Sequence, residues 1–127
     1  MGIPASKRLR KQGDFLEVRT EGKRILCGPF IFQCHWHAAD VESGRRFGVI
    51  ASRRVGNAVK RNLGKRTFRE IFRKNEATLP ECCDVVVVLR HSFDQHAFSD
   101  LEFRFLRACA TSFKASQAPA ESTNDEE

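Results

Sequence analysis

Positive charge is concentrated in one stretch of the sequence, residues 45–74. The stretch holds eleven of the chain's 22 lysines and arginines and one carboxylate, Glu70, so it carries +10 while all other residues sum to −4. Such a local field indicates a partner with many negative charges, most simply the phosphates of a nucleic acid. Arginine outnumbers lysine here, which suits bidentate contacts with phosphates or base edges.

The second half of this stretch has the periodicity of an amphipathic helix from Asn57 to about Lys74. Gly56 breaks the strand-like run before it, and Asn57 is a favourable N-cap. A turn of roughly 100° per residue separates a polar from an apolar side. The polar side holds Arg61, Asn62, Lys65, Arg66, Arg69 and Arg73, and the other side holds Val59, Leu63, Thr67, Phe68, Ile71 and Phe72. Cations at i, i+4 repel one another, so a binding face is favoured over a merely solvated one.

A dense motif lies within this thirty-residue stretch. It consists of Ser52-Arg53-Arg54-Val55-Gly56-Asn57-Ala58-Val59, then Arg61-Asn62-Leu63-Gly64-Lys65-Arg66, then Arg69-Glu70. The motif resembles the signature of the protein subunit of bacterial ribonuclease P. Two positions depart from it, since the family often has a basic residue at Leu63 and an aliphatic one at Gly64. Because glycine costs about 0.5–1 kcal/mol inside a helix, we expect Gly64→Ala to stabilise the protein.

The resemblance implies a role beside a catalytic RNA. In that family an RNA with bound Mg²⁺ removes the 5′ leader from precursor tRNA, and the small protein binds the RNA and the leader and lowers the Mg²⁺ requirement. One protein per RNA is expected. The implied contacts with the catalytic RNA are Arg53, Arg54, Asn57, Arg61, Asn62, Lys65, Arg66, Arg69 and Arg73, with a phosphate also received by the amides around Gly56 and Asn57.

The same resemblance implies a cleft for the leader. Its lining would be Phe15, Arg19, Gln33 and Ser52. Arg19 and Gln33 stand where the family usually has aromatic residues, so stacking on the leader is expected to be weaker here. For Phe15, plain core packing is an equally good interpretation.

Other elements are predicted from local patterns. A helix over residues 15–21 is capped by Asp14 and ended by Gly22. Residues 24–38 alternate with a period of two, interrupted by Gly28-Pro29, which predicts a short strand and then a long one. A turn at 40–45 and a strand at 47–52 follow. Residues 84–89 form a continuous apolar run, typical of a strand covered on both faces at the centre of a sheet.

The last helix is predicted from Ser99, in a capping box with Glu102, to about Lys114, and Asn75 is the predicted C-cap of the basic helix. The order is αβββαβα, an α+β domain over residues 1–114 with a mobile arm at 1–8 and a disordered acidic tail at 115–127. The sheet is expected to be mainly antiparallel and four-stranded with one parallel pair. Crossovers between parallel strands are right-handed in ~98% of cases, whereas the resemblance implies a left-handed one (ribosomal protein S5 domain 2-like).

Several kinds of chemistry lack support in the sequence. Five cysteines without a C-x-x-C spacing favour free thiols in a reducing cytoplasm, and His35 with His37 has no third ligand spaced to join them. Carboxylates are scattered, so no Mg²⁺ site is predicted in the protein. No apolar run approaches the ~20 residues of a membrane helix, and we expect no secretion signal. We expect a cytoplasmic protein that contacts no membrane and binds RNA rather than cutting it.

Two alternative functions stay open at this point. A structural RNA-binding protein of ribosomal type would share the basic helix but lack the spaced Arg-Asn-x-x-Lys-Arg run. A DNA-binding protein would place the basic helix in the major groove. Neither a dimer-forming element nor helix-turn-helix spacing supports the second alternative.

Overall fold

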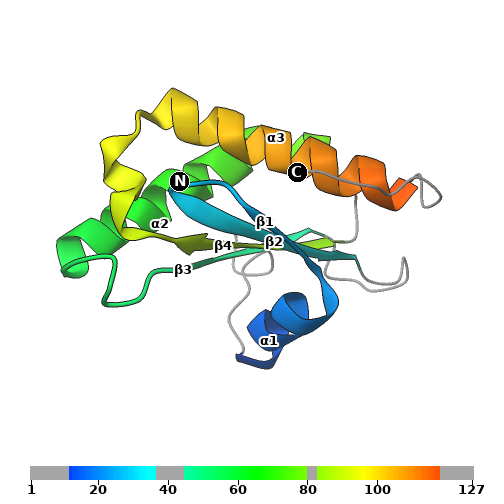
Figure 1. The fold of residues 1–127 in the computed structure, drawn as a ribbon, viewed down its shortest axis with the longest axis horizontal. Coiled ribbons are helices and arrows are strands. Elements are labelled where there is room, and N and C mark those ends of the chain that lie inside the picture. The colour runs from blue at the N-terminus through cyan, green and yellow to red at the C-terminus, as the bar shows by residue number, and fades with distance from the viewer. Residues whose placement is uncertain (1–11, 37–44, 80–82, 118–127) are drawn as a thin grey trace.

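The computed structural model describes residues 12–36, 45–79 and 83–117, which form three α-helices and four strands. In chain order the elements are α1 (Gln12–Glu21), β1 (Lys23–Leu26), β2 (Phe30–Trp36), β3 (Arg46–Ile50), α2 (Ala58–Asn75), β4 (Cys83–Leu89) and α3 (Phe98–Gln117). Two short 3₁₀ helices, η2 (Glu76–Thr78) and η3 (His91–Gln95), follow α2 and β4. The predicted αβββαβα order is confirmed (Figure 1).

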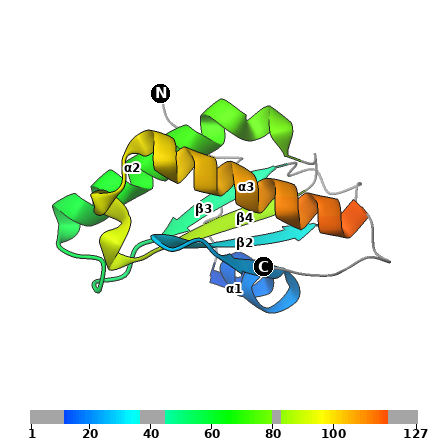
Figure 2. The same cartoon turned by 45° about the horizontal axis from the view of Figure 1, so that its top comes forward.

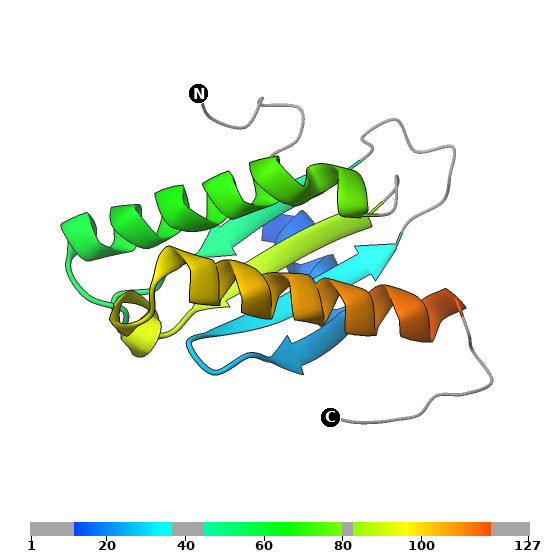
Figure 3. The same cartoon turned by 90° about the horizontal axis from the view of Figure 1, so that it is seen from above.

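The four strands form one mixed sheet in the order β1-β2-β4-β3. β1 and β2, and β2 and β4, are antiparallel, while β3 and β4 are parallel. The apolar run of β4 is central in the sheet, as predicted. Seen from the helix side, the chain leaves β3, passes through α2 in front of the sheet and enters β4 in the left-handed sense (Figure 3). The crossover therefore departs from the general right-handed preference.

Helices cover both faces of the sheet. α2 and α3 lie side by side on one face, and α1 lies on the other (Figures 1 and 2). The main core fills the space beneath α2 and α3. Alternate residues of β2 are fully buried in this core, namely Phe30, Phe32 and Cys34. Phe30 meets Phe68 edge-on at 4.8 Å between ring centroids. None of the described helices is long and apolar enough to cross a membrane.

Some predicted helix ends were wrong. α1 begins at Gln12, so Asp14 lies inside its first turn and is not the cap. α3 begins at Phe98, because the amides of Asp100 and Leu101 bond to the carbonyl of Ala97, so Ser99 is not the cap either. Asn75 is the last residue of α2, and its side-chain amide donates to the Ile71 carbonyl and to Glu102 at 2.8 Å each.

Other boundaries also shifted. β3 ends at Ile50, two residues short of the predicted strand end, and α3 continues to Gln117, so the predicted disordered tail is wrong for residues 115–117. The remaining tail, the arm at 1–8 and most of the turn at 40–45 lie outside the described residues.

The apolar side of α2 was only partly predicted correctly. Phe68, Ile71 and Phe72 are buried against the sheet, but Val59 is 78% exposed and Leu63 is 46% exposed. Val59 and Phe68 are nine positions apart, and at roughly 100° per residue they point to opposite sides of the helix. The two large phenylalanines determine which side of α2 faces the core, so Val59 and Leu63 face outward.

Gly64 is buried on the side of α2 that faces Leu89 of β4 and Phe93 of η3. A Cβ at this position would overlap the Leu89 Cδ1 and lie 3.0 Å from the Phe93 Cζ. Both side chains belong to the packed core. This geometry argues against the expectation that alanine stabilises this position, because overpacking typically costs about 1–3 kcal/mol and exceeds the helix-propensity gain.

We predict that Gly64→Ala destabilises the protein by about 1 kcal/mol, measured by chemical denaturation. The double variant Gly64→Ala with Leu89→Val should be less destabilised than the sum of the two single variants, because the smaller Val makes room for the added methyl. Strict additivity, or a raised melting temperature for Gly64→Ala alone, would show that the close contact has no energetic consequence.

Candidate nucleic-acid interface

The turn between β3 and α2 presents two arginines to solvent. The amide of Val55 donates to the Ser52 carbonyl at 3.0 Å, and that of Gly56 donates to the Arg53 carbonyl at 3.2 Å. Val55 is buried in the main core with 1% of its surface exposed. Because the Val55 side chain anchors the turn from inside, Arg53 and Arg54 must project outward, and both are exposed.

The first turn of α2 is capped as predicted. The side-chain oxygen of Asn57 accepts a hydrogen bond from the amide of Lys60 at 2.9 Å. Gly56 precedes the cap with a φ of 150°, a conformation that side chains rarely adopt. No acidic residue lies in the first turn. The positive end of the helix dipole is therefore not offset by a carboxylate there, which favours an anion such as phosphate.

The predicted RNA-binding residues of α2 differ in exposure. Asn62 and Arg66 are exposed, whereas Arg61, Lys65 and Arg69 are half-buried along one flank of the helix. The Nε of Arg61 donates to the Gly56 carbonyl at 3.2 Å. Arg61 thus also holds the turn, and removing it would disturb Arg53 and Arg54 indirectly. Arg66 is the cleaner position at which to test charge alone.

Several cations of the basic stretch are engaged inside the protein. Lys60 lies over the Phe93 ring, with its Nζ 3.4 Å from Asp94. Arg46 pairs with the buried Asp84 through two bonds of 2.9 and 2.8 Å. On α2, Arg73 donates its Nε to Glu70 at 3.1 Å. This hydrogen bond is the main cause that holds the pKa of Glu70 below its usual value.

These pairs determine which charges face a partner. Lys74 also approaches a carboxylate, that of Glu102, at 3.5 Å. Arg53, Arg54 and Arg66 make no ion pair with another described residue and are exposed. The positive charges that face outward therefore lie mainly in the 52–57 turn and on α2. On α2 they lie on the exposed side, at Arg66, and along the half-buried side that includes Lys65.

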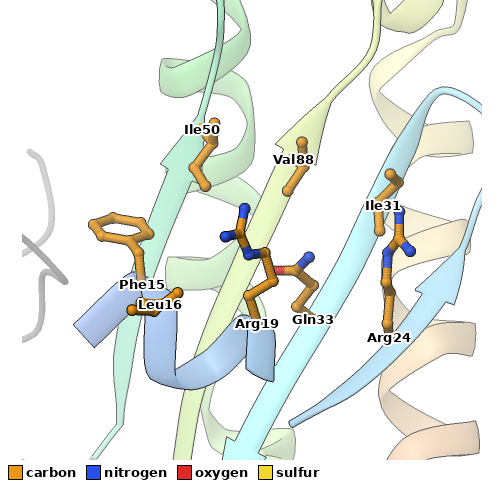
Figure 4. A pocket seen from close by; sticks show the side chains of 8 residues that line it. All are labelled: Phe15, Leu16, Arg19, Arg24, Ile31, Gln33, Ile50 and Val88. Atoms are coloured by element: carbon orange, nitrogen blue, oxygen red, sulfur yellow. The ribbon is translucent and has the colours of Figure 1, made fainter. Parts of the chain in front are cut away.

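A cleft lies on the opposite face of the sheet, next to α1. Its volume is about 820 Å³. The lining residues are Phe15, Leu16, Arg19, Arg24, Ile31, Gln33, Ile50 and Val88 (Figure 4). The strand register pairs Ile31 with Val88 and Val88 with Ile50, so these three form an apolar row across β2, β4 and β3.

Three of the four predicted leader-binding residues line this cleft. Phe15 and Arg19 come from α1 and Gln33 from β2, where only 5% of Gln33 is exposed. Ser52 lies in the turn after β3 and is not among the lining residues. Phe15 also packs against the small cluster of Val18 and Val86. It therefore both packs and lines the cleft.

Five of the lining residues were not predicted from the sequence. They are Leu16, Arg24, Ile31, Ile50 and Val88. One signal was available, because Ile31 and Gln33 are two residues apart on one strand and must share a face. Arg24 is the register partner of Gln33 across β1 and β2. The positions of Ile50 and Val88 require the strand order, which local patterns do not supply.

Metal-ligating side chains do not cluster among the described residues. These residues contain no group of three or more His, Cys, Asp or Glu side chains that could hold a metal ion. Cys27, Cys34 and Cys109 are free thiols, and Cys82 lies outside the described part of the chain. Burial raises the pKa of the Cys27 and Cys34 thiols to about 11, so both are protonated at neutral pH.

Fold and surface together define a small α+β nucleic-acid-binding protein, with a basic helix on one face of its sheet and a cleft on the other. Residues 3–112 match the family model described as Ribonuclease P. The ribonuclease P protein component of Thermotoga maritima is 34% identical over 101 residues, covering 80% of this chain and 83% of that relative. That of Syntrophus aciditrophicus is 30% identical over 99 residues, covering 78% and 81%.

Solved structures agree with this assignment. The RNase P protein from Thermotoga maritima superposes with a TM-score of 0.69 at 32% identity, covering 80% of this chain and 94% of that one. The RNase P protein of Staphylococcus aureus shares the fold, with a TM-score of 0.69 at 23% identity and coverage of 83% and 93%. The chain belongs to the family of ribonuclease P protein components. It is thus an RNA-binding subunit of an endoribonuclease complex of tRNA processing and a partner of ribonuclease P RNA.

Proposed function

We propose that this subunit binds ribonuclease P RNA through its basic surface and holds the 5′ leader of precursor tRNA in the cleft beside α1. The observation that carries the proposal is the position of β3. Ile50, at the end of this strand, lines the cleft, and Arg53 and Arg54 follow in the turn directly after it. A leader lying in the cleft would therefore emerge beside the surface that binds the catalytic RNA.

The cleft has the two features that single-stranded RNA requires. The row of Ile31, Val88 and Ile50 provides an apolar floor, and Phe15 provides an aromatic ring at its Ile50 end (Figure 4). Arg19 and Arg24 are exposed and supply positive charge for phosphates. Apolar or aromatic contact with bases combined with cations along the backbone gives sequence-tolerant binding.

We assign catalysis to the RNA and its bound Mg²⁺. On the basic helix the one carboxylate, Glu70, is paired with Arg73, which leaves it poorly suited to hold a metal ion. The cations of the protein would instead reduce repulsion among RNA phosphates, so that the complex needs less Mg²⁺ than the RNA alone. We further propose that one protein binds each RNA and that the complex acts in the cytoplasm. The spaced motif from Arg61 to Arg66 favours this role over that of a ribosomal-type structural protein.

The leader site can be tested at Phe15. Phe15→Ala should weaken binding of precursor tRNA to the reconstituted complex by about fivefold to tenfold, the low end of the range for one stacked base. Binding of mature tRNA should not change, since it has no leader. The measurement is the dissociation constant of each tRNA. Phe103→Ala is a matched control, because Phe103 is an exposed phenylalanine on α3, outside the cleft.

Two results would contradict the leader site. One is equal affinity of the wild-type complex for precursor and mature tRNA. The other is an equal loss of affinity for both tRNAs in Phe15→Ala, which would indicate a purely structural role. Phe15→Trp keeps an aromatic surface and should restore most of the preference for the precursor.

A further inference from the structure

Two aliphatic side chains are exposed in the middle of the basic surface. Val59 and Leu63 are 78% and 46% exposed and lie one helical turn apart on α2. Residues at i and i+4 are neighbours on a helix surface, so the two side chains form one apolar strip. Asn62 and Arg66 lie beside this strip.

The fold does not explain this apolar strip. α2 packs on β3 and contacts α3, η2 and η3 with its other side. Its outer side faces away from the sheet (Figures 2 and 3). Neither residue belongs to the core clusters or packs against them. Helix propensity does not explain Val59 either, because a β-branched residue is not a favoured helix former. An exposed apolar patch within a charged surface suggests a contact made with a partner.

The surrounding charge identifies the occupant of the strip. Arg53, Arg54 and Arg66 are exposed near it, and the whole stretch of residues 45–74 carries +10. A second copy of the chain would bring an identical cationic surface into contact, which like-charge repulsion opposes. A polyanion is attracted instead. Apolar side chains cannot bind phosphates, so within an RNA they must contact the sugars and the base faces.

We infer that Val59 and Leu63 contact the base and sugar faces of unpaired nucleotides in ribonuclease P RNA. This inference rests on the proposed function. It adds an apolar contact, which salt does not screen, to the surrounding phosphate contacts. Unpaired nucleotides are required because paired, stacked bases hide their faces. The strip therefore selects a particular place on the RNA, whereas the cations bind any suitably shaped backbone.

The experiment compares affinity and salt dependence for the double variant Val59→Ala/Leu63→Ala. Alanine keeps the helix and removes only exposed apolar surface, so the fold should be retained. Affinity for ribonuclease P RNA should fall by about fivefold to tenfold at every salt concentration, with an unchanged slope of log affinity against log salt. Leu63→Lys should instead increase the magnitude of that slope by about 0.9, the value for one added phosphate contact. Leu26→Ala, at a 66% exposed leucine on β1, is the matched control and should bind as wild type.

Heparin serves as a second probe, because it has negative charge but no bases. The double variant should bind heparin as tightly as wild type does. Wild-type affinity of the double variant for the RNA, or an equal loss on heparin, would overturn the inference. Dimers of the wild-type chain that dissociate in the double variant, seen by sedimentation, would assign the strip to a second copy instead. Failure of the wild-type chain to bind ribonuclease P RNA would contradict the proposed function itself.

Discussion

Affinity for ribonuclease P RNA should fall by roughly 10³-fold between 50 and 200 mM monovalent salt. The reason is the number of phosphate contacts predicted in the basic stretch, those of Arg53, Arg54, Arg61, Lys65, Arg66 and Arg69. Each phosphate contact releases condensed counterions, which gives a slope of about −0.9 per contact. A salt series of dissociation constants measures the slope directly. A flat series would contradict electrostatic binding.

A triple variant locates this effect on the surface. Arg53→Ala/Arg54→Ala/Arg66→Ala removes three exposed guanidinium groups that make no ion pair with another described residue. The slope should decrease in magnitude by about 3, and affinity near 0.15 M salt should fall on the order of 100-fold. The matched control is Lys23→Ala/Arg90→Ala/Arg107→Ala, which removes the same charge from exposed positions outside the 52–57 turn and α2. Equal losses in both variants would show that net charge matters and position does not.

The sequence was most informative where structure is determined locally. Asn57 caps α2 because its side chain reaches an amide only three residues away. The apolar run of β4 is central because an uninterrupted apolar strand needs cover on both faces. The family motif could be identified because residue types and spacing on one helix are visible without any tertiary information.

Features that depend on packing between distant segments could not be predicted in this way. Val59 and Leu63 have the composition of a core face, but the fit of Phe68 and Phe72 against the sheet turns them outward. Gly64 looked unfavourable until its neighbours Leu89 and Phe93 were known, more than twenty residues along the chain. The cleft floor likewise exists only because β4 lies between β2 and β3.

The second large effect concerns the division of labour between protein and RNA. The protein alone should not cleave precursor tRNA at any Mg²⁺ concentration, since the described residues contain no group of three or more His, Cys, Asp or Glu side chains that could hold a metal ion. Added to ribonuclease P RNA, it should lower the Mg²⁺ needed for cleavage, because its cations take over part of the phosphate neutralisation. The triple arginine variant should lose much of this benefit, while the control triple variant should keep it.

Reconstitution tests the central claim most directly. Removal of the 5′ leader from precursor tRNA is measured across a Mg²⁺ series with the protein alone, with ribonuclease P RNA alone and with both together. We expect no cleavage by the protein, cleavage by the RNA only at high Mg²⁺, and cleavage by the complex at several-fold lower Mg²⁺. Cleavage by the RNA-free protein, or an unchanged Mg²⁺ requirement when the protein is added, would contradict this claim.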